Sequence, residues 1–196
     1  MSVQHVKNKI IGLTGGIATG KSTVSKYLKS KGYPVIDSDE IVHHLWHESS
    51  LMIEEVIIAF ALDPKKDIVE QLRTFVFNDK VNIEKLNTIV HPYVFKTIED
   101  QLQTLQHHKI IFIDMPLLFE VGYDQKVDLT WVVYAPKNMQ INRIIKRDQL
   151  DEIEAKKRID QQMDIELKKQ LAHVVIDNTK QLTDLYRLID RQLKEV

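Results

Sequence analysis

Eight consecutive residues near the start of the chain have the spacing of a phosphate-binding loop. The run from Gly15 to Ser22 reads Gly-Gly-Ile-Ala-Thr-Gly-Lys-Ser and fits the pattern G-x-x-x-x-G-K-[ST]. Glycine is needed there because the backbone must approach phosphate oxygens with its N–H groups turned inward, where a Cβ would obstruct it. Lys21 can reach the β- and γ-phosphates of a nucleotide, and the Ser22 hydroxyl can join the ligands of Mg²⁺. The pattern predicts that Mg·ATP contacts this loop and the first turn after it, through Gly15, Gly16, Ile17, Ala18, Thr19, Gly20, Lys21, Ser22 and Thr23.

An apolar run that ends in a carboxylate supplies a further candidate for the metal. Residues 110–113 are Ile-Ile-Phe-Ile and Asp114 follows them, which is the form expected of a Walker B strand. We therefore predict that Asp114 orders Mg²⁺ or its water shell beside Ser22. The alternative is that Asp114 is a plain turn residue at the end of a buried strand.

Two more carboxylates, Asp37 and Asp39, follow the apolar run 34–36. In an extended tripeptide, residues two apart share a face, so both carboxylates would face one cleft and contact the acceptor. One could position Mg²⁺-bound water while the other takes the proton of the acceptor hydroxyl. We favour Asp39 as this base, although the residues alone do not separate it from Asp37. The alternative is that Asp39 caps a helix that begins near Glu40.

A pair of arginines lies on a predicted helix at 138–147. Arg143 and Arg147 are four residues apart, so they share a face, opposite the one formed by the isoleucines of this helix. Such a pair can close over the β- and γ-phosphates and spread the charge that develops on the leaving group. Arg158 lies further along the same arm, residues 138–170, which we expect to form a lid. The alternative is a solvated basic face that pairs with neighbouring acids such as Asp148.

An α/β fold with a mainly parallel sheet has to position these residues. Short segments rich in Ile and Val predict buried strands at 9–13, 34–36, 110–113, 130–134 and 174–176. Helical patterns alternate with them, as at 21–31 before Gly32, so helices should cover both faces of the sheet in three layers. A last helix at 181–196 would turn Leu182, Leu185, Leu188 and Ile189 inward. Residues 49–106 are helical in pattern and too long for one crossover. We read 1–196 as a single domain with 49–106 as a helical, acceptor-binding insertion over the carboxyl edge of the sheet.

The composition restricts the partners. The chain has 196 residues with 27 Lys and Arg against 28 Asp and Glu, a formal net charge of -1, so no global field attracts nucleic acid. It has no cysteine, which excludes disulfides and thiolate metal sites. Its apolar runs are too short to cross a membrane, and residues 1–9 lack the apolar core of a signal peptide. We expect a cytoplasmic protein, a monomer or weak oligomer, whose partners are small molecules.

Two segments resemble the signatures of the dephospho-CoA kinase family. Residues 114–120, Asp-Met-Pro-Leu-Leu-Phe-Glu, are similar to the family's D-x-P-L-L-F-E, and residues 12–17, Gly-Leu-Thr-Gly-Gly-Ile, match its opening. The likeness continues at 37–39, which is close to the family's D-A-D, and at His91-Pro92, Arg158-Ile159 with Gln162, and Ile176-Asp177-Asn178. It implies a P-loop kinase core that uses Mg²⁺ and ATP to phosphorylate the ribose 3′-hydroxyl of dephospho-CoA, the last step of coenzyme A biosynthesis.

The resemblance also implies roles for individual residues. Asp39 matches the family's proposed general base, and Asn178 matches an asparagine near the adenine. His91 and the turn residues Pro116, Leu117, Leu118, Phe119 and Glu120 would line the acceptor side, although a His before Pro also fits a helix end. The chain departs from the family pattern at Thr179 and Val69, where a glycine and an arginine are usual, and in a shorter 48–67 segment. These departures concern the acceptor contacts more than the ATP site.

Three other functions compete. A nucleoside monophosphate kinase shares the phosphate loop, but the segment 116–120 argues against it. A GTP-binding switch needs Asp-x-x-Gly, whereas Asp114 is followed by Met-Pro-Leu, and no Asn/Thr-Lys-x-Asp segment for guanine is present. A nucleotide-binding regulator without catalysis has the same motifs, so only an assay separates it from an enzyme.

Overall fold

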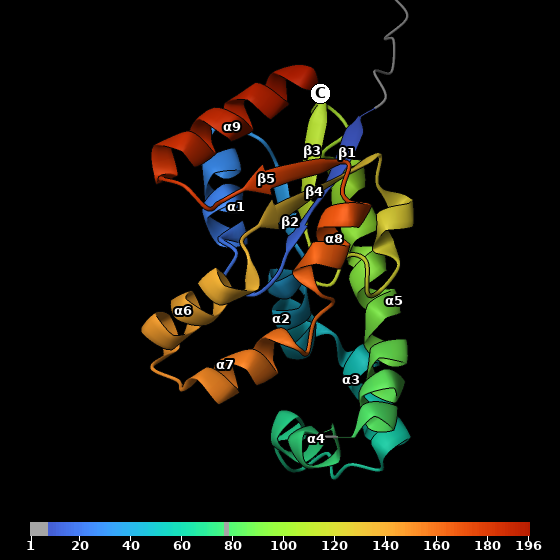
Figure 1. Ribbon diagram of the computed structural model, residues 1–196. Helices are drawn as coiled ribbons and strands as arrows, with labels where there is room; N and C mark the ends of the chain where they lie inside the picture. The colour runs from blue at the N-terminus through green and yellow to red at the C-terminus, as the bar shows by residue number, and fades with distance from the viewer. Residues whose placement is uncertain (1–7, 77–78) are drawn as a thin grey trace, which may run out of the picture. The chain divides into compact units, whose positions relative to one another are not determined.

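A five-stranded parallel sheet, in the order β2-β3-β1-β4-β5, forms the centre of the larger of two compact units (Figure 1). The computed structural model describes residues 8–76 and 79–196, so the expectation that no signal peptide is present at the amino terminus falls mostly outside it. The strands are β1 (Lys9–Gly15), β2 (Val35–Asp37), β3 (Ile110–Asp114), β4 (Leu129–Tyr134) and β5 (Val174–Asp177). The predicted parallel α/β sheet is confirmed, with strand ends within two residues of the predicted ones.

One face of the sheet is covered by α1 (Lys21–Ser30) and α9 (Leu182–Glu195), which pack side by side (Figure 1). Ile11, Trp131 and Ile176 of the strands form one buried core with Leu28 of α1 and Ile189 of α9. Burial of these large side chains is the main stabilising term, roughly 1.5–3 kcal/mol for each.

The prediction that Leu182 turns inward is wrong, since 51% of the residue is exposed, whereas Leu185 and Ile189 are buried. Helical side chains lean toward the helix N-terminus, so the side chain of a first-turn residue extends past the end of the helix. Helix α1 ends as expected, with Gly32 in the left-handed region at φ 85° just beyond it.

The predicted lid segment 138–170 coincides with most of α6 (Lys137–Asp148), all of α7 (Glu152–Ile159) and most of α8 (Ile165–Leu171), and α8 packs against β4. Ile144 of α6 is buried with Ala155 and Ile159 of α7, and Ile17 and Ala18 of the phosphate loop pack against this cluster. The isoleucine face of α6 is therefore confirmed as a packing face. A short 3₁₀ turn, η1 (Tyr123–Lys126), precedes β4.

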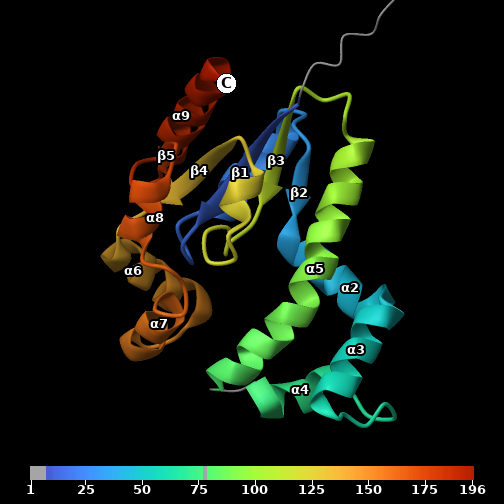
Figure 2. The ribbon, with the colours of Figure 1, turned by 90° about the vertical axis from the view of Figure 1, so that its right-hand side faces the viewer.

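The second unit, residues 38–104, is helical and consists of α2 (Ser38–Glu48), α3 (Ser50–Phe60), α4 (Ile68–Val76) and α5 (Lys80–Thr104). The long α5 lies along α2 and α3 (Figure 2), and Val56, Phe60 and Leu72 form a core between α3, α4 and α5. Helix α5 continues through Pro92, so the alternative that His91 marks a helix end is wrong. No helix in the described residues is both long and apolar enough to span a membrane.

Candidate active site

The phosphate loop lies between the end of β1 and the first turn of α1, at the carboxyl edge of the sheet. Gly20 is the N-cap residue of α1 and has φ 99°, a backbone conformation that disfavours a side chain. Because no side chain caps this helix end, the first amides of α1 are available to an anion. The Thr19 hydroxyl and amide both donate to the Gly16 carbonyl, at 2.8 and 3.2 Å, and close the loop on itself.

Arg143 and Asn178 hold the loop from outside. Arg143 of α6 donates to the carbonyls of Ala18 (3.1 Å), Thr19 (3.3 Å) and Asn178 (2.8 Å), and Asn178 Nδ2 donates to the Thr19 carbonyl at 2.8 Å. A loop that binds phosphate through its N–H groups turns its carbonyls away from the ligand, so these carbonyls need other donors. Both side chains therefore brace the loop in this structure.

Two carboxylates meet at the neighbouring strand ends. Asp37 and Asp114 are register partners on β2 and β3, and Asp114 forms an ion pair with Lys21. Burial raises the pKa of the Asp114 carboxyl, the Lys21 ammonium opposes this rise, and Asp37 adds to it. The side chain of Asp114 is only 2% exposed and that of Lys21 is 16% exposed, so this pair is largely shielded from water.

The oxygen donors at this edge fit a magnesium ion. Mg²⁺ prefers one or two carboxylates together with substrate phosphates and water, and the exposed Ser22 hydroxyl lies in the first turn of α1 next to Lys21. Within residues 8–76 and 79–196, no group of three or more His, Cys, Asp or Glu side chains could hold a metal by itself.

Asp39 is not part of an extended tripeptide, so the predicted geometry of Asp37 and Asp39 is wrong. Helix α2 begins at Ser38 and Asp39 lies exposed in its first turn, whereas Asp37 is the last residue of β2. Acidic residues are favoured in a first helical turn, which explains why the chain turns helical one residue after the strand. The alternative in which Asp39 caps a helix that starts near Glu40 is wrong for the same reason.

The turn after β3 is held by internal contacts. Leu118 is fully buried, and a Cβ added to Gly12 would lie only 2.7 Å from its Cδ2 methyl group, so the glycine leaves room for this side chain. Glu120 accepts a hydrogen bond from the Met163 amide at 2.9 Å and pairs with Lys168 at 2.8 Å. Leu117 is exposed, and Pro116 and Phe119 are partly exposed, so these three side chains have surface that an acceptor can contact.

The remaining predicted site residues have other surroundings. Arg147 and Arg158 both pair with Asp148, at 2.7 and 2.9 Å, which is the pairing that the solvated-face alternative describes. His91 stacks on Phe95 within the helical unit, and its burial lowers the pKa of the imidazole. Of Arg143, Arg147 and Arg158, Arg143 is therefore the one that contacts the loop, while the other two pair with Asp148.

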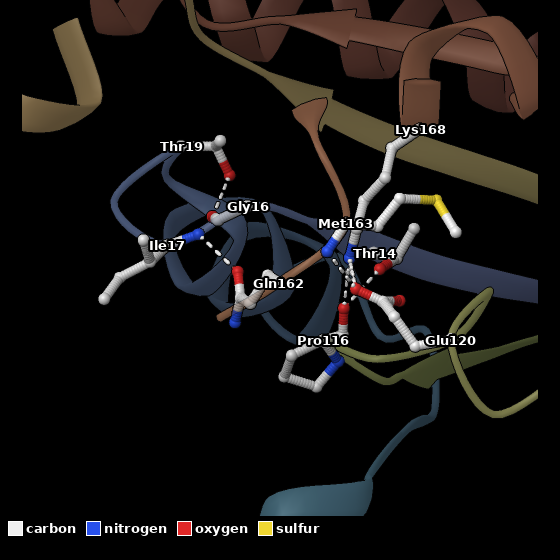
Figure 3. Close-up of polar contacts among 9 residues, drawn as sticks. All are labelled: Thr14, Gly16, Ile17, Thr19, Pro116, Glu120, Gln162, Met163 and Lys168. Carbon is white, nitrogen blue, oxygen red and sulfur yellow. Dashed lines mark hydrogen bonds and ion pairs between the residues drawn. The ribbon is translucent and has the colours of Figure 1, made fainter. Parts of the chain in front are cut away.

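Sequence reasoning missed the surroundings of the loop, which Figure 3 shows. Lys168 lies on the buried face of α8 together with Ile165. In the sequence, its position three residues after an isoleucine is the signal that could have placed it on the apolar face of a helix. Thr14 donates to the Pro116 carbonyl at 3.0 Å, and Gln162 Oε1 accepts from the Ile17 amide at 2.9 Å. Thr14, Pro116 and Gln162 all lie at positions that resemble the family, but the resemblance does not give these contacts, which join segments far apart in sequence.

Comparisons with known proteins agree with this arrangement. The family model described as "Dephospho-CoA kinase" matches residues 9–184. Relatives named dephospho-CoA kinase include one from Fusobacterium nucleatum, 42% identical over 93% of this chain and 95% of its own, and one from Helicobacter pylori strain J99, 39% identical over 94% and 95%.

Solved structures agree as well. The dephospho-CoA kinase from Campylobacter jejuni superposes with a TM-score of 0.70 at 33% identity, over 95% of this chain and 96% of that one. A Thermus thermophilus structure reaches a TM-score of 0.83 at 32% identity, over 97% and 98%. A shikimate kinase from Acinetobacter baumannii, with a TM-score of 0.52 at 16% identity, over 97% and 95%, shares the fold. As the motifs at 12–17 and 114–120 predict, the chain belongs to the dephospho-CoA kinase family.

Proposed function

We propose that the chain transfers the γ-phosphate of ATP to the ribose 3′-hydroxyl of dephospho-CoA and releases ADP and coenzyme A. The observation that carries this is the placement of the turn 114–120, which is specific to the family, directly beside the phosphate loop. Asp114 is a register partner of Leu13, and the Thr14 hydroxyl binds the Pro116 carbonyl. Membership of the dephospho-CoA kinase family favours this activity over that of a nucleoside monophosphate kinase, a GTP switch or a regulator without catalysis.

We assign the phosphates to the backbone amides of the loop and of the first turn of α1, residues 15–23. The Ile17 amide donates to Gln162 in this structure, so a phosphate would have to replace Gln162 there. Lys21 exchanges Asp114 for phosphate oxygens, because its ammonium is partly exposed and its side chain starts at the helix N-terminus. Arg143 and Asn178 act on ATP through the loop, since both contact its carbonyls. Asn178 remains our candidate for a residue close to the adenine.

Magnesium, when bound, neutralises charge on the β- and γ-phosphates and draws them into reacting geometry. Ser22 would hold it together with the carboxylate of Asp114 or Asp37. These residues are hard oxygen donors at one edge of the sheet, which supports this assignment.

Asp39 is our candidate for the base that takes the proton of the acceptor hydroxyl. Only one residue separates it from Asp37, so covalent geometry keeps the two Cα atoms within roughly 7 Å of each other. A base needs hydrogen-bond reach of the hydroxyl, and Asp39 is exposed in the first turn of α2, where an acceptor can approach its carboxylate. Asp37 would then lie against the acceptor or the metal.

We assign the acceptor side to His91 and to the turn 116–120, in which Leu117, Pro116 and Phe119 offer side-chain surface and the carboxylate of Glu120 is held internally. Leu118 would act by packing under the turn. Arg147, which is exposed, would leave Asp148 and close over the phosphates as the lid closes.

One assay tests the function. Purified protein is incubated with Mg·ATP and, separately, dephospho-CoA, AMP, CMP and shikimate, and both ADP and the phosphorylated product are measured. We expect turnover with dephospho-CoA alone. Turnover with one of the other acceptors only would contradict the assignment, and ATP binding without any turnover would favour the regulator.

The role of Asp39 has its own test. Asp39→Asn should lower kcat by about 10²- to 10⁴-fold because the proton then has no acceptor, while the affinity for ATP stays nearly constant. Glu40→Gln is the matched control, since Glu40 is the neighbouring exposed acid in the same helical turn. If the Asp39 variant retained kcat within a few-fold of the wild type, positioning would be the main source of rate.

We further propose that the enzyme works in the cytoplasm on two small-molecule substrates, as a monomer or weak oligomer, without nucleic-acid or membrane partners. The balanced charge of -1 supports this proposal. Light scattering after size-exclusion chromatography measures the oligomeric state directly.

A further inference from the structure

A lysine without any exposed surface lies beside the site. The side chain of Lys168 on α8 is 0% exposed, and its ammonium donates to Glu120 Oε1 at 2.8 Å and to the Pro116 carbonyl at 2.7 Å (Figure 3). Since it is sealed from solvent in this structure, it offers no surface to a substrate.

The two oxygens that accept hydrogen bonds from Lys168 also accept hydrogen bonds from other parts of the chain. The Thr14 hydroxyl, one residue before the phosphate loop, donates to the same Pro116 carbonyl at 3.0 Å. The Met163 amide donates to the same Glu120 oxygen at 2.9 Å. Gln162, the residue before Met163, accepts from the Ile17 amide of the loop at 2.9 Å. Lys168 therefore joins the loop strand, the turn 116–120 and the segment 160–168. This segment belongs to the predicted lid region, leads from α7 into α8 and is called here the return segment.

Stability alone is a weak explanation for this arrangement. Burial lowers the pKa of the Lys168 ammonium, Glu120 opposes the change, and the charge of Lys21 lowers the pKa further. The pair is buried on the lysine side, since the Glu120 side chain is still 21% exposed. A buried ion pair often contributes no more to stability than apolar side chains of the same volume, while the loss of Glu120 would leave an unpaired buried ammonium. Unlike apolar packing, the ammonium makes directional hydrogen bonds, and these hold Glu120 and the Pro116 carbonyl of the turn 116–120 in defined positions.

We propose that Lys168 is a positioning residue for phosphoryl transfer. It fixes the turn 116–120 and the return segment against the phosphate loop, and so sets where the acceptor turn and the lid stand relative to the transferred phosphate. The proposal rests on the proposed function, because the turn 116–120 is there assigned to the acceptor. A misplacement of about 1 Å in such a frame can cost roughly 10²-fold in rate.

The test substitutes Lys168→Met, which keeps most of the side-chain volume and removes the charge and its hydrogen bonds. Lys169→Met is the matched control, because Lys169 is the next residue on α8 and its side chain is 43% exposed. ATP affinity and stoichiometry are measured by calorimetry, and kcat is expressed per ATP-binding site. We expect kcat per site to fall by about 10- to 100-fold in the Lys168 variant, with ATP affinity within about threefold of wild type, and no change for Lys169→Met.

A purely structural role would reduce the number of ATP-binding sites and leave kcat per site unchanged, and that result would overturn the proposal. A loss of ATP affinity in parallel with kcat would overturn it as well, since Lys168 would then support the loop alone.

If Lys168→Met does not fold, Thr14→Val tests the proposal instead, because it removes only the hydroxyl that shares the Pro116 carbonyl with Lys168. We expect kcat to fall about three- to tenfold in this variant, and an unchanged kcat per site would end the idea. A wild-type enzyme inactive on dephospho-CoA would contradict the proposed function instead, so the two failures are distinguishable.

Discussion

Gly20→Ala should destabilise the protein through two separable effects. The residue has φ 99°, so an alanine there carries a left-handed backbone strain of about 1–2 kcal/mol. A Cβ at this position would also lie 2.1 Å from Asn178 Nδ2, which no packing allows, so Asn178 must move. Its hydrogen bond to the Thr19 carbonyl is then lost, at about 0.5–1.5 kcal/mol. Together these give a loss of roughly 1.5–3.5 kcal/mol in the free energy of unfolding.

Gly32→Ala separates the two effects. Gly32 has φ 85°, but among the described residues beyond its chain neighbours no atom lies within 4 Å of a Cβ built there, so only the backbone strain applies. Urea unfolding followed by circular dichroism should show the Gly20 variant less stable than the Gly32 variant by about 0.5–1.5 kcal/mol, with similar m-values. Calorimetry should show weaker ATP binding for the Gly20 variant alone, since Gly32 lies beyond the far end of α1.

The Asn178→Ala background identifies the obstructing side chain. Without Asn178, the Gly20 substitution should cost no more than the Gly32 substitution, because the remaining penalty is backbone strain. Equal losses for the two glycine variants in the wild-type background would refute the clash. A Gly20 loss that stays the same after Asn178 is removed would refute it too.

Two further variants probe the charges at the loop. Arg143→Lys should raise the Kd for ATP by roughly tenfold in a calorimetric titration. The reason is that a single ammonium cannot reproduce the hydrogen bonds that the guanidinium makes to three carbonyls. An unchanged Kd would show that the loop holds its shape without these hydrogen bonds. Asp114→Asn tests the burial of the carboxyl. The wild-type protein should lose stability relative to this variant as the pH rises from 3.8 through the raised folded-state pKa of Asp114, since between these values the folded state binds more protons than the unfolded state. Urea unfolding at several pH values measures this, and a wild-type protein that gains stability relative to the variant as the pH rises would contradict the burial of the carboxyl.

Local patterns predicted the sheet and the loop well because their causes are local. Apolar runs bounded by polar residues indicated all five strands, and the glycine spacing at 15–22 indicated the loop between β1 and α1. The family signatures at 12–17 and 114–120 then indicated the function. Each of these features can be read from one short window of sequence.

The errors arose where two local signals compete or where the partner lies far away in the chain. Asp39 follows a strand and could extend it, yet its acidic character also favours a first helical turn, and the helix forms. For Arg143, the periodicity gives the face of α6 but not its target, because the carbonyls of Ala18 and Thr19 lie more than 120 residues away. A hydrogen bond of that span is decided by the packing of the sheet, which no window of sequence contains.

The carboxylates at the two ends of the signature 114–120 each pair with a lysine, but the two lysines differ in exposure. Asp114 opens the segment and pairs with Lys21, whose side chain is 16% exposed at the loop. Glu120 closes it and pairs with Lys168, whose side chain is 0% exposed. Lys21 keeps some exposed surface through which a phosphate oxygen can reach its ammonium, whereas Lys168 has none. The segment is thus held by one exchangeable ion pair on the ATP side and one fixed ion pair on the lid side, which lets nucleotide binding change the first while the second keeps the turn in place.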